Sequence, residues 1–169
     1  RSLKGRYGIP VTSAMISDVP GMTWNMIPTL AQAGVRYCSS GPNGPYSGGD
    51  RTGHTNRAWA DRPFYWVSPS GNERILYWMA GYGYGSFFAG VSSRNSDQLR
   101  FLRNLSRYFD WLDEIGYPYD MIQMRHTING DNGTVDPDLP EYVNSWNERH
   151  ISPKISISTT QGLFREFEN

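Results

Sequence analysis

The stretch GIPVTSAMISDVPGMTWNMIPTLAQAGVRYCSS, residues 8–40, decides the fold class of this 169-residue chain. Residues 8–16 are mostly small or β-branched and predict a buried strand, and a loop over 17–21 follows. Thr23 can cap a helix whose end suits Gly34 as the C′ residue, and residues 35–40 predict a second strand. The apolar positions of that helix recur at helical spacing: Met26, Ile27, Leu30 and Ala33. A strand, a helix and a strand in this order form a βαβ unit, and such units build parallel sheets.

The rest of the chain continues to alternate between strand and helix patterns. Residues 64–67 and 74–79 flank a turn and predict a hairpin, and an apolar stripe predicts a helix from Asn95 or Ser96 to Gly116. Further strands are predicted over 119–127 and 155–158, with further helices from Asp138, where Glu141 completes a capping box, and over 160–167. This order favours an α/β fold, either a doubly wound sheet or a (β/α) barrel. Both place their sites at the carboxyl ends of strands.

Composition excludes several classes of function. Lys plus Arg and Asp plus Glu both number 16, so the net charge is zero, which argues against a nucleic-acid clamp and a basic membrane-surface helix. No apolar run approaches 18 residues, so no transmembrane helix is predicted. The single cysteine, Cys38, excludes an internal disulfide framework and is expected in a buried strand. We therefore expect neither nucleic acid nor membrane as a partner, and the sequence leaves the compartment open.

Two aspartates stand in loops that follow predicted strands. Asp18 follows the first strand, and Asp131 lies in the glycine-rich loop after residue 127. Glycosidases need two carboxyl groups, and parallel strands can deliver distant carboxylates to one face of a sheet. The alternative interpretation is that each aspartate forms an Asx turn or caps a helix.

Aromatic residues make up 14% of the chain and offer surfaces on which a sugar ring can stack. Trp78, Trp111 and Trp146 lie in predicted strands or helices and are expected in the core. The three histidines show no metal-ligand spacing. The residues selected as candidates for substrate binding are Trp24, Trp59, Tyr82, Tyr84 and His126.

Two segments resemble the glycoside hydrolase family 38 α-mannosidases. AMISDVPGMTW, residues 14–24, with the helix that ends AQAGV, is similar to the nucleophile segment of that family. HTINGDNG, residues 126–133, with the elements after it, is similar to the segment that carries the acid/base. The resemblance implies that Asp18 is the nucleophile and a zinc ligand, that Asp131 is the acid/base, and that the substrate is a glycan. It further implies part of an irregular (β/α) barrel with parallel strands and outer helices.

The resemblance also implies that residues 1–169 are a single segment of a larger catalytic domain whose N- and C-terminal parts are missing. The other zinc ligands would then lie outside the chain, the rest of its own polypeptide would be a partner, and the isolated chain is predicted to be inactive. Met22 stands where the family has histidine, which favours the alternative of a non-catalytic or degenerate glycan-binding member. Two further alternatives are a metal-dependent deacetylase-like hydrolase and a structural domain in which both aspartates are caps.

Overall fold

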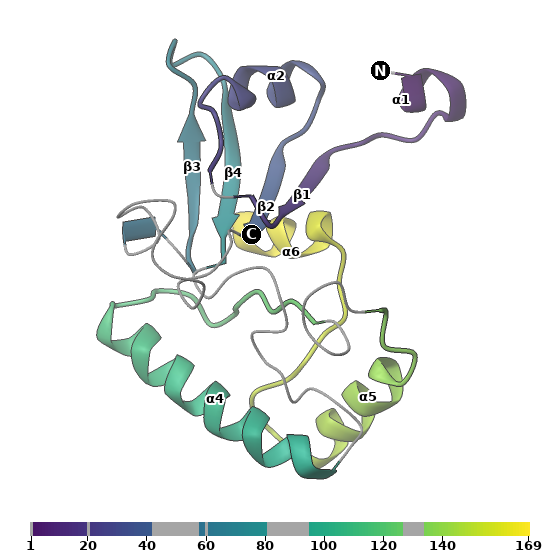
Figure 1. Ribbon diagram of the computed structural model, residues 1–169, viewed down its shortest axis with the longest axis vertical. Coiled ribbons are helices and arrows are strands. Elements are labelled where there is room, and N and C mark those ends of the chain that lie inside the picture. The colour runs from purple at the N-terminus through teal and green to yellow at the C-terminus, as the bar shows by residue number, and fades with distance from the viewer. Residues whose placement is uncertain (1, 20, 42–57, 60, 81–94, 127–133) are drawn as a thin grey trace. The chain divides into compact units, whose positions relative to one another are not determined.

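The computed structural model describes residues 2–19, 21–41, 58–59, 61–80, 95–126 and 134–169 (Figure 1). The chain forms two compact units. One comprises Arg1–Tyr84 with Ser158–Asn169, and the other comprises Gly85–Ile157. The first unit contains a mixed sheet with helices packed on it, so the predicted α/β class is confirmed.

The sheet of the first unit has four strands in the order β1-β2-β4-β3. A short helix, α1 (Ser2–Tyr7), precedes β1 (Ser13–Ser17), which pairs in parallel with β2 (Tyr37–Gly41). β2 pairs in parallel with β4 (Arg74–Met79), and β3 (Pro63–Val67) pairs antiparallel with β4. The predicted hairpin is therefore confirmed, as is the parallel pairing of the first two strands. The first strand is shorter than the predicted range 8–16 and is not buried, because residues 8–12 form no strand and β1 is an edge of the sheet. The central strands β2 and β4 are almost entirely buried, and β1 and β3 are the edges.

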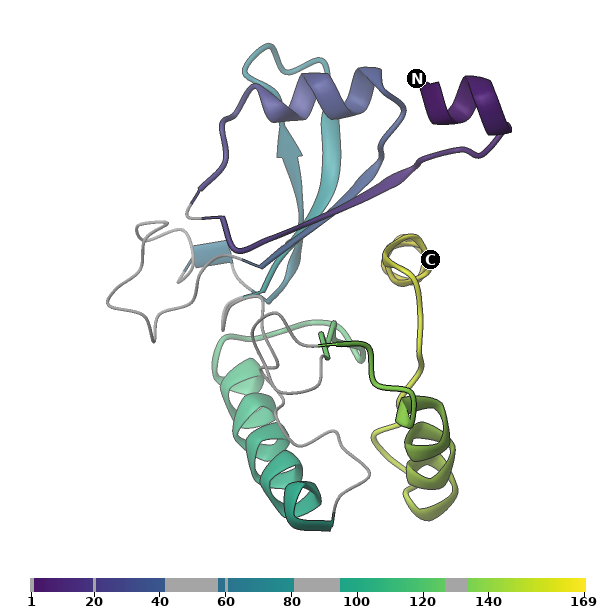
Figure 2. The ribbon, with the colours of Figure 1, turned by 45° about the vertical axis from the view of Figure 1, so that its right-hand side comes forward.

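Helix α2 (Met26–Gln32) connects the two parallel strands (Figure 2). It begins after Asn25 rather than after a Thr23 cap, and Asn25 makes no side-chain cap bond. Instead the Met26 N–H donates to the carbonyl of Thr23 in a tight turn. Gly34 has φ +90°, a left-handed conformation that glycine adopts without strain, so its predicted place at the helix end is confirmed.

One face of the sheet packs against α2. Side chains alternate between the faces of a strand, so every second residue of each strand joins this layer. Its buried members are Ile27, Cys38, Ile75, Tyr77 and Met79. The burial predicted for Cys38 is thus confirmed.

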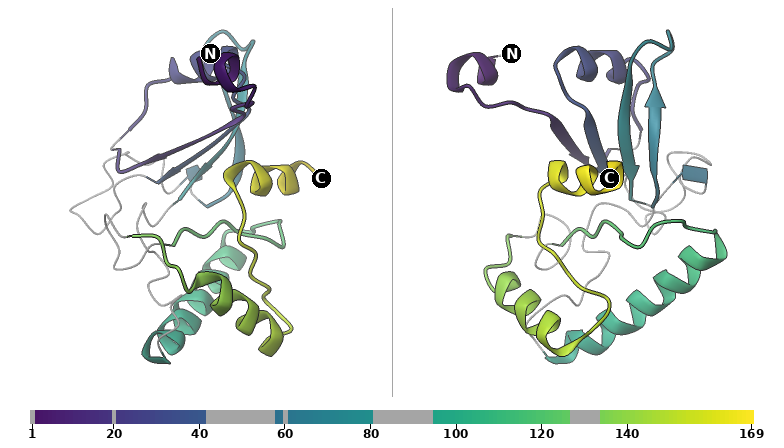
Figure 3. Two further views of the ribbon diagram at one scale, coloured as in Figure 1. Left: turned by 90° about the vertical axis from the view of Figure 1, so that its right-hand side faces the viewer. Right: turned by 180° about the vertical axis from the view of Figure 1, so that it is seen from behind.

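The opposite face packs against α6 (Thr160–Glu168), which lies beside β1 and β2 (Figure 3). Phe164 is fully buried and stacks on Tyr37 with ring centroids 5.4 Å apart, and Phe167 stacks on the fully buried Trp78. The hydroxyl of Thr159 accepts from the Gly162 N–H and caps the helix. The sheet therefore has an apolar helix layer on both faces, as its buried central strands require.

The second unit contains α4 (Asn95–Glu114) and α5 (Leu139–Arg149). Both helices were expected from their apolar spacing, and their buried residues meet where the ring of Phe101 lies edge-on to Trp146, 5.2 Å between centroids. Trp146 is buried as predicted, whereas Trp111 is only partly buried.

Two predicted strands are wrong. Residues 119–126 form no strand, and residue 127 lies outside the described residues. Residues 155–158 also form no strand. The reason at Ile155 is that the side-chain amide of Asn147 takes both of its main-chain groups, accepting from its N–H at 2.9 Å and donating to its carbonyl at 2.8 Å. A side chain therefore supplies the bonds that a neighbouring strand would have supplied.

The predicted capping box of α5 is also wrong. Asp138 precedes the helix but makes no side-chain cap bond. Its N–H donates to the carboxylate of Asp136 at 3.1 Å, which forms an Asx turn directly before the helix. Among the residues that the structure describes, no helix is both long and apolar enough to cross a membrane.

Candidate functional site

Asp18 is the first residue beyond β1, at the carboxyl-terminal edge of the three parallel strands. Its N–H donates to the carbonyl of Gly41 at the end of β2, 2.9 Å away, and its side chain is exposed. Its φ of 57° lies in the left-handed region. This conformation is unfavourable for most residues other than glycine, and Asp and Asn tolerate it best. The fold therefore holds a carboxylate in a strained backbone at the edge where α/β proteins build their sites.

A second left-handed aspartate, Asp61, lies at the same edge and was not selected from the sequence. Its φ is 55°, its side chain is buried, and its N–H donates to the carbonyl of Met79 at the end of β4. The strand order puts it three strand spacings from Asp18, about 14 Å between main chains. Two aspartate side chains do not close that gap to the roughly 5 Å of a retaining carboxylate pair. Asp61 is therefore a neighbour of the site rather than the partner of Asp18.

Trp59 is brought to the same edge as Asp18. It stands two residues before Asp61, its ring is 5.7 Å from that of Phe64 in β3, and half of its surface is exposed. A half-exposed indole provides an apolar surface of the kind that the C–H face of a sugar covers.

Trp24 lies at the opposite edge, although only six positions separate it from Asp18. Its indole N–H donates to the carbonyl of Val67, 2.7 Å away. Val67 ends β3 and pairs with Arg74, the first residue of β4, so this is the amino-terminal edge of the parallel strands, where α2 lies (Figure 2). The structure thus does not bring Trp24 to Asp18, and it gives the indole a bond to the main chain of an edge strand.

Met22 occupies the position at which the resemblance implies a histidine. It is partly buried against the core below α2, and the hydroxyl of Tyr77 donates to its sulfur at 2.8 Å. The side chain at this position therefore belongs to the core cluster.

The described residues do not by themselves suit a zinc ion. Asp18 offers carboxylate oxygens, but the part of the chain that the structure describes contains no group of three His, Cys, Asp or Glu side chains that could hold a metal. A zinc site at Asp18 would need further ligands from outside the described residues.

His126 belongs to the second unit, where its Nε2 lies 2.8 Å from the carboxylate of Asp136. Asp136 is not among the site residues predicted from the sequence. The sequence feature that could have pointed to it is its position shortly before a predicted helix. Asp131, Tyr82 and Tyr84 lie outside the described residues.

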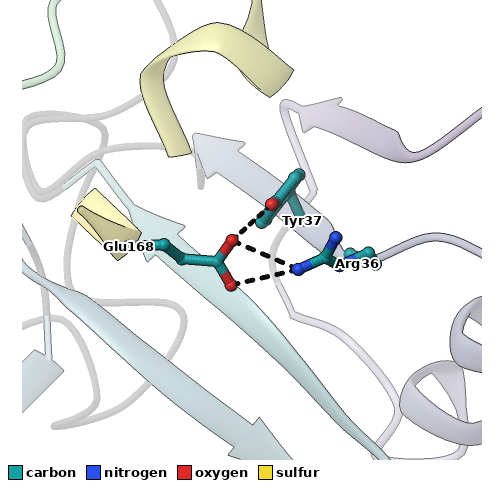
Figure 4. Close-up of polar contacts among 3 residues, drawn as sticks. All are labelled: Arg36, Tyr37 and Glu168. Carbon is teal, nitrogen blue, oxygen red and sulfur yellow. Dashed lines mark hydrogen bonds and ion pairs between the residues drawn. The ribbon is translucent and has the colours of Figure 1, made fainter. Parts of the chain in front are cut away.

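A polar cluster anchors the end of α6 at the amino end of β2 (Figure 4). The Tyr37 hydroxyl donates to the carboxylate of Glu168, and the Arg36 guanidinium is 3.2 Å from the same group. Burial raises the pKa of Tyr37, and the hydrogen bond to Glu168 raises it further. Asp18 lies at the other end of the parallel strands, so this cluster is not part of the candidate site. Its contacts stabilise the packing of α6 on the sheet.

A scan against models of known protein families gives no match, and searches of curated proteins and of solved structures give no significant match either.

Proposed function

We propose that the chain is part of a carbohydrate-active hydrolase, a retaining glycosidase similar to the zinc-dependent α-mannosidases, with Asp18 as its nucleophile. The observation that carries the proposal is the exposed Asp18 carboxylate, held in a left-handed backbone directly beyond a parallel strand. The half-exposed Trp59 at the same edge supports a sugar as the ligand. The resemblance of residues 14–24 supplies the reaction class.

The proposed reaction has two displacements at the anomeric carbon. An oxygen of Asp18 forms a bond to that carbon while the bond to the leaving oxygen breaks, and Asp131 donates a proton to the leaving group. Water then attacks the same carbon, its proton passes to Asp131, and the bond to Asp18 breaks. The configuration is retained because each displacement inverts it once. The role of Asp131 and the participation of zinc rest on the resemblance alone.

We further propose that the three parallel strands are part of a larger (β/α) barrel that continues beyond β1. β1 is an edge strand of the described sheet, and exposed apolar side chains lie on it and just before it. Ile9 and Met15 are about 60% exposed, and Val11 is 43% exposed. A further strand or helix would bury this surface, as barrel closure requires.

Kinetics of the full-length gene product on 4-nitrophenyl α-mannoside test the function. We expect turnover that Asp18→Asn lowers by at least roughly a thousandfold. The matched control is Asp110→Asn, which removes one exposed carboxylate from α4 and should leave the rate unchanged. The isolated 169-residue chain should show no turnover. Equal rates for Asp18→Asn and the wild type would contradict the assignment of the nucleophile.

A chemical rescue separates loss of the nucleophile from loss of structure. In Asp18→Gly, azide can enter the space of the missing carboxylate, form a bond to the anomeric carbon and expel nitrophenolate. The expected product is a glycosyl azide of inverted configuration, formed only in this variant. Glycosyl azide from the wild type at the same rate would count against Asp18.

A glycan-binding protein without turnover is the second candidate, and one observation favours it. Met22 is packed against Tyr77 in the core instead of presenting a metal ligand beside Asp18. This candidate predicts that the full-length protein binds a mannoside in calorimetry without hydrolysing it. It also predicts that Trp59→Ala weakens binding while Trp24→Ala leaves it unchanged, since the two indoles lie at opposite edges.

A further inference from the structure

A partly buried arginine without a partner stands at the carboxyl-terminal edge of the parallel strands. Arg62 lies between the left-handed Asp61 and Pro63, the first residue of β3. Its Nε is buried, and the part of the chain that the structure describes gives its guanidinium no hydrogen bond, ion pair or ring contact. Burying a donor of a charged group without an acceptor costs free energy, so such groups are normally paired. The acceptor for Arg62 is therefore expected from a ligand.

Two other arginines beside the sheet show the contrast. The Arg36 guanidinium is 3.2 Å from the carboxylate of Glu168, and that of Arg74 lies over the ring of Tyr65, 4.4 Å from its centroid. Both arginines are exposed, so water can solvate them as well. Both stand at the amino-terminal ends of the parallel strands, one directly before β2 and the other at the start of β4. Arg62 is less exposed, lies at the opposite edge and has no such partner.

The surroundings of Arg62 suit a sugar that carries an acid group. Trp59, three positions earlier, is half-exposed and offers a ring surface beside β3. Asp18 is three strand spacings away at the same edge, about 14 Å between main chains, which leaves room for a sugar between the two side chains. A guanidinium presents paired N–H donors that match two oxygens of a carboxylate or a phosphate.

We propose that Arg62 binds an anionic group of the ligand, so that the chain acts on an acidic glycan whose sugar carries a carboxylate or a phosphate. The sugar part of this inference rests on the proposed function, whereas the binding of an anion at Arg62 does not. No bond is made or broken at Arg62, which selects the substrate and is not a catalytic residue.

Phosphate binding tests the anion site without any glycoside. The full-length protein is titrated with inorganic phosphate at constant ionic strength, and the affinity is measured by calorimetry. We expect Arg62→Met, which keeps the length of the side chain without its charge, to weaken binding at least about tenfold. Arg62→Lys keeps the charge without the paired donors and should give an intermediate affinity. The matched control is Arg74→Met, which removes a cation at the other edge and should leave the affinity unchanged.

Three results would overturn the anion site. The first is a wild-type protein that binds no phosphate. The second is an unchanged affinity in both Arg62 variants, with circular dichroism showing that they fold. The third is an equal loss of affinity in Arg74→Met, because the effect would then follow net charge rather than position.

Matched substrates identify the acid group. Kinetics are compared on 4-nitrophenyl α-mannoside, on its 6-phosphate and on the corresponding mannuronide. We expect Arg62→Met to raise KM for the preferred anionic substrate at least about tenfold, while kcat and the KM of the neutral mannoside stay unchanged. A wild-type preference for the 6-phosphate identifies a phosphorylated sugar, and a preference for the mannuronide identifies a uronic acid.

The outcomes separate this inference from the proposed function. Phosphate binding that requires Arg62, in a protein that hydrolyses none of the three glycosides, would support the anion site and refute the glycosidase. Turnover of the neutral mannoside that depends on Asp18, with no preference for either anionic substrate, would overturn the acidic glycan and leave the nucleophile intact.

Discussion

The left-handed backbone at Asp18 predicts that replacing this residue by glycine makes the protein more stable. A left-handed conformation costs a residue with a Cβ roughly 1–2 kcal/mol, and aspartate recovers part of this through local hydrogen bonds. Glycine avoids the steric cost but loses about 0.5–1 kcal/mol of chain entropy on folding. The net expectation for Asp18→Gly is a free energy of unfolding higher by about 0.5 kcal/mol.

Two further variants at Asp18 and one variant at a left-handed glycine test this estimate. Asp18→Ala should lower the free energy of unfolding by about 1 kcal/mol, because alanine has the Cβ without the compensating side chain. Asp18→Asn should change it by less than about 0.5 kcal/mol, since asparagine tolerates this region as well as aspartate does. Gly71 has φ +78° in the same unit, and a Cβ there would meet no atom within 4 Å. Gly71→Ala therefore measures the backbone cost alone.

The assay is urea unfolding of all five proteins followed by tryptophan fluorescence. We expect the free energy of unfolding to be highest for Asp18→Gly, intermediate for the wild type and Asp18→Asn, and lowest for Asp18→Ala. We also expect the difference between Asp18→Gly and Asp18→Ala to match, within about 0.5 kcal/mol, the loss caused by Gly71→Ala. An Asp18→Gly protein no more stable than Asp18→Ala would refute the claim that the fold stores strain at the proposed nucleophile.

Three further variants test the packing within each unit. Tyr37→Phe should lower the free energy of unfolding by about 1–2 kcal/mol at pH 7. The folded protein raises the pKa of Tyr37, so above about pH 10 the unfolded chain releases this proton while the folded protein keeps it. The wild type should therefore lose stability above that pH. A pH series of urea midpoints should show a smaller loss in the Tyr37→Phe variant. Phe164→Ala should cost about 3–5 kcal/mol, as its fully buried ring leaves a cavity. Asn147→Ala should cost about 1–3 kcal/mol and speed hydrogen exchange at the Ile155 amide, since both bonds to that residue are lost.

The elements that could be predicted from the sequence are those with local signals. The first βαβ unit follows from an apolar strand, helical spacing and Gly34, and the structure shows Gly34 with φ +90° at the end of α2. The hairpin follows from two apolar runs around a turn, and β3 and β4 pair there. The burial of Cys38 follows from its place in a short strand between two predicted elements of a βαβ sheet.

The errors arise where distant contacts decide the outcome. Residues 155–158 alternate isoleucine and serine in the manner of a strand, but Asn147 takes the main-chain bonds of Ile155. Trp24 follows Asp18 closely in sequence, yet its indole binds the carbonyl of Val67, which no short-range pattern encodes. The pairing of His126 with Asp136 likewise depends on how two segments meet.

Covalent trapping identifies the carboxylate that attacks the sugar. The full-length protein is incubated with a fluorinated α-mannosyl fluoride, which transfers its sugar to the nucleophile. The resulting adduct is hydrolysed slowly, so it can be located by peptide mass spectrometry. We predict one sugar per protein, carried by Asp18 and absent from Asp18→Asn. A stable adduct on another carboxylate, or none in a protein that turns over aryl mannosides, would contradict it.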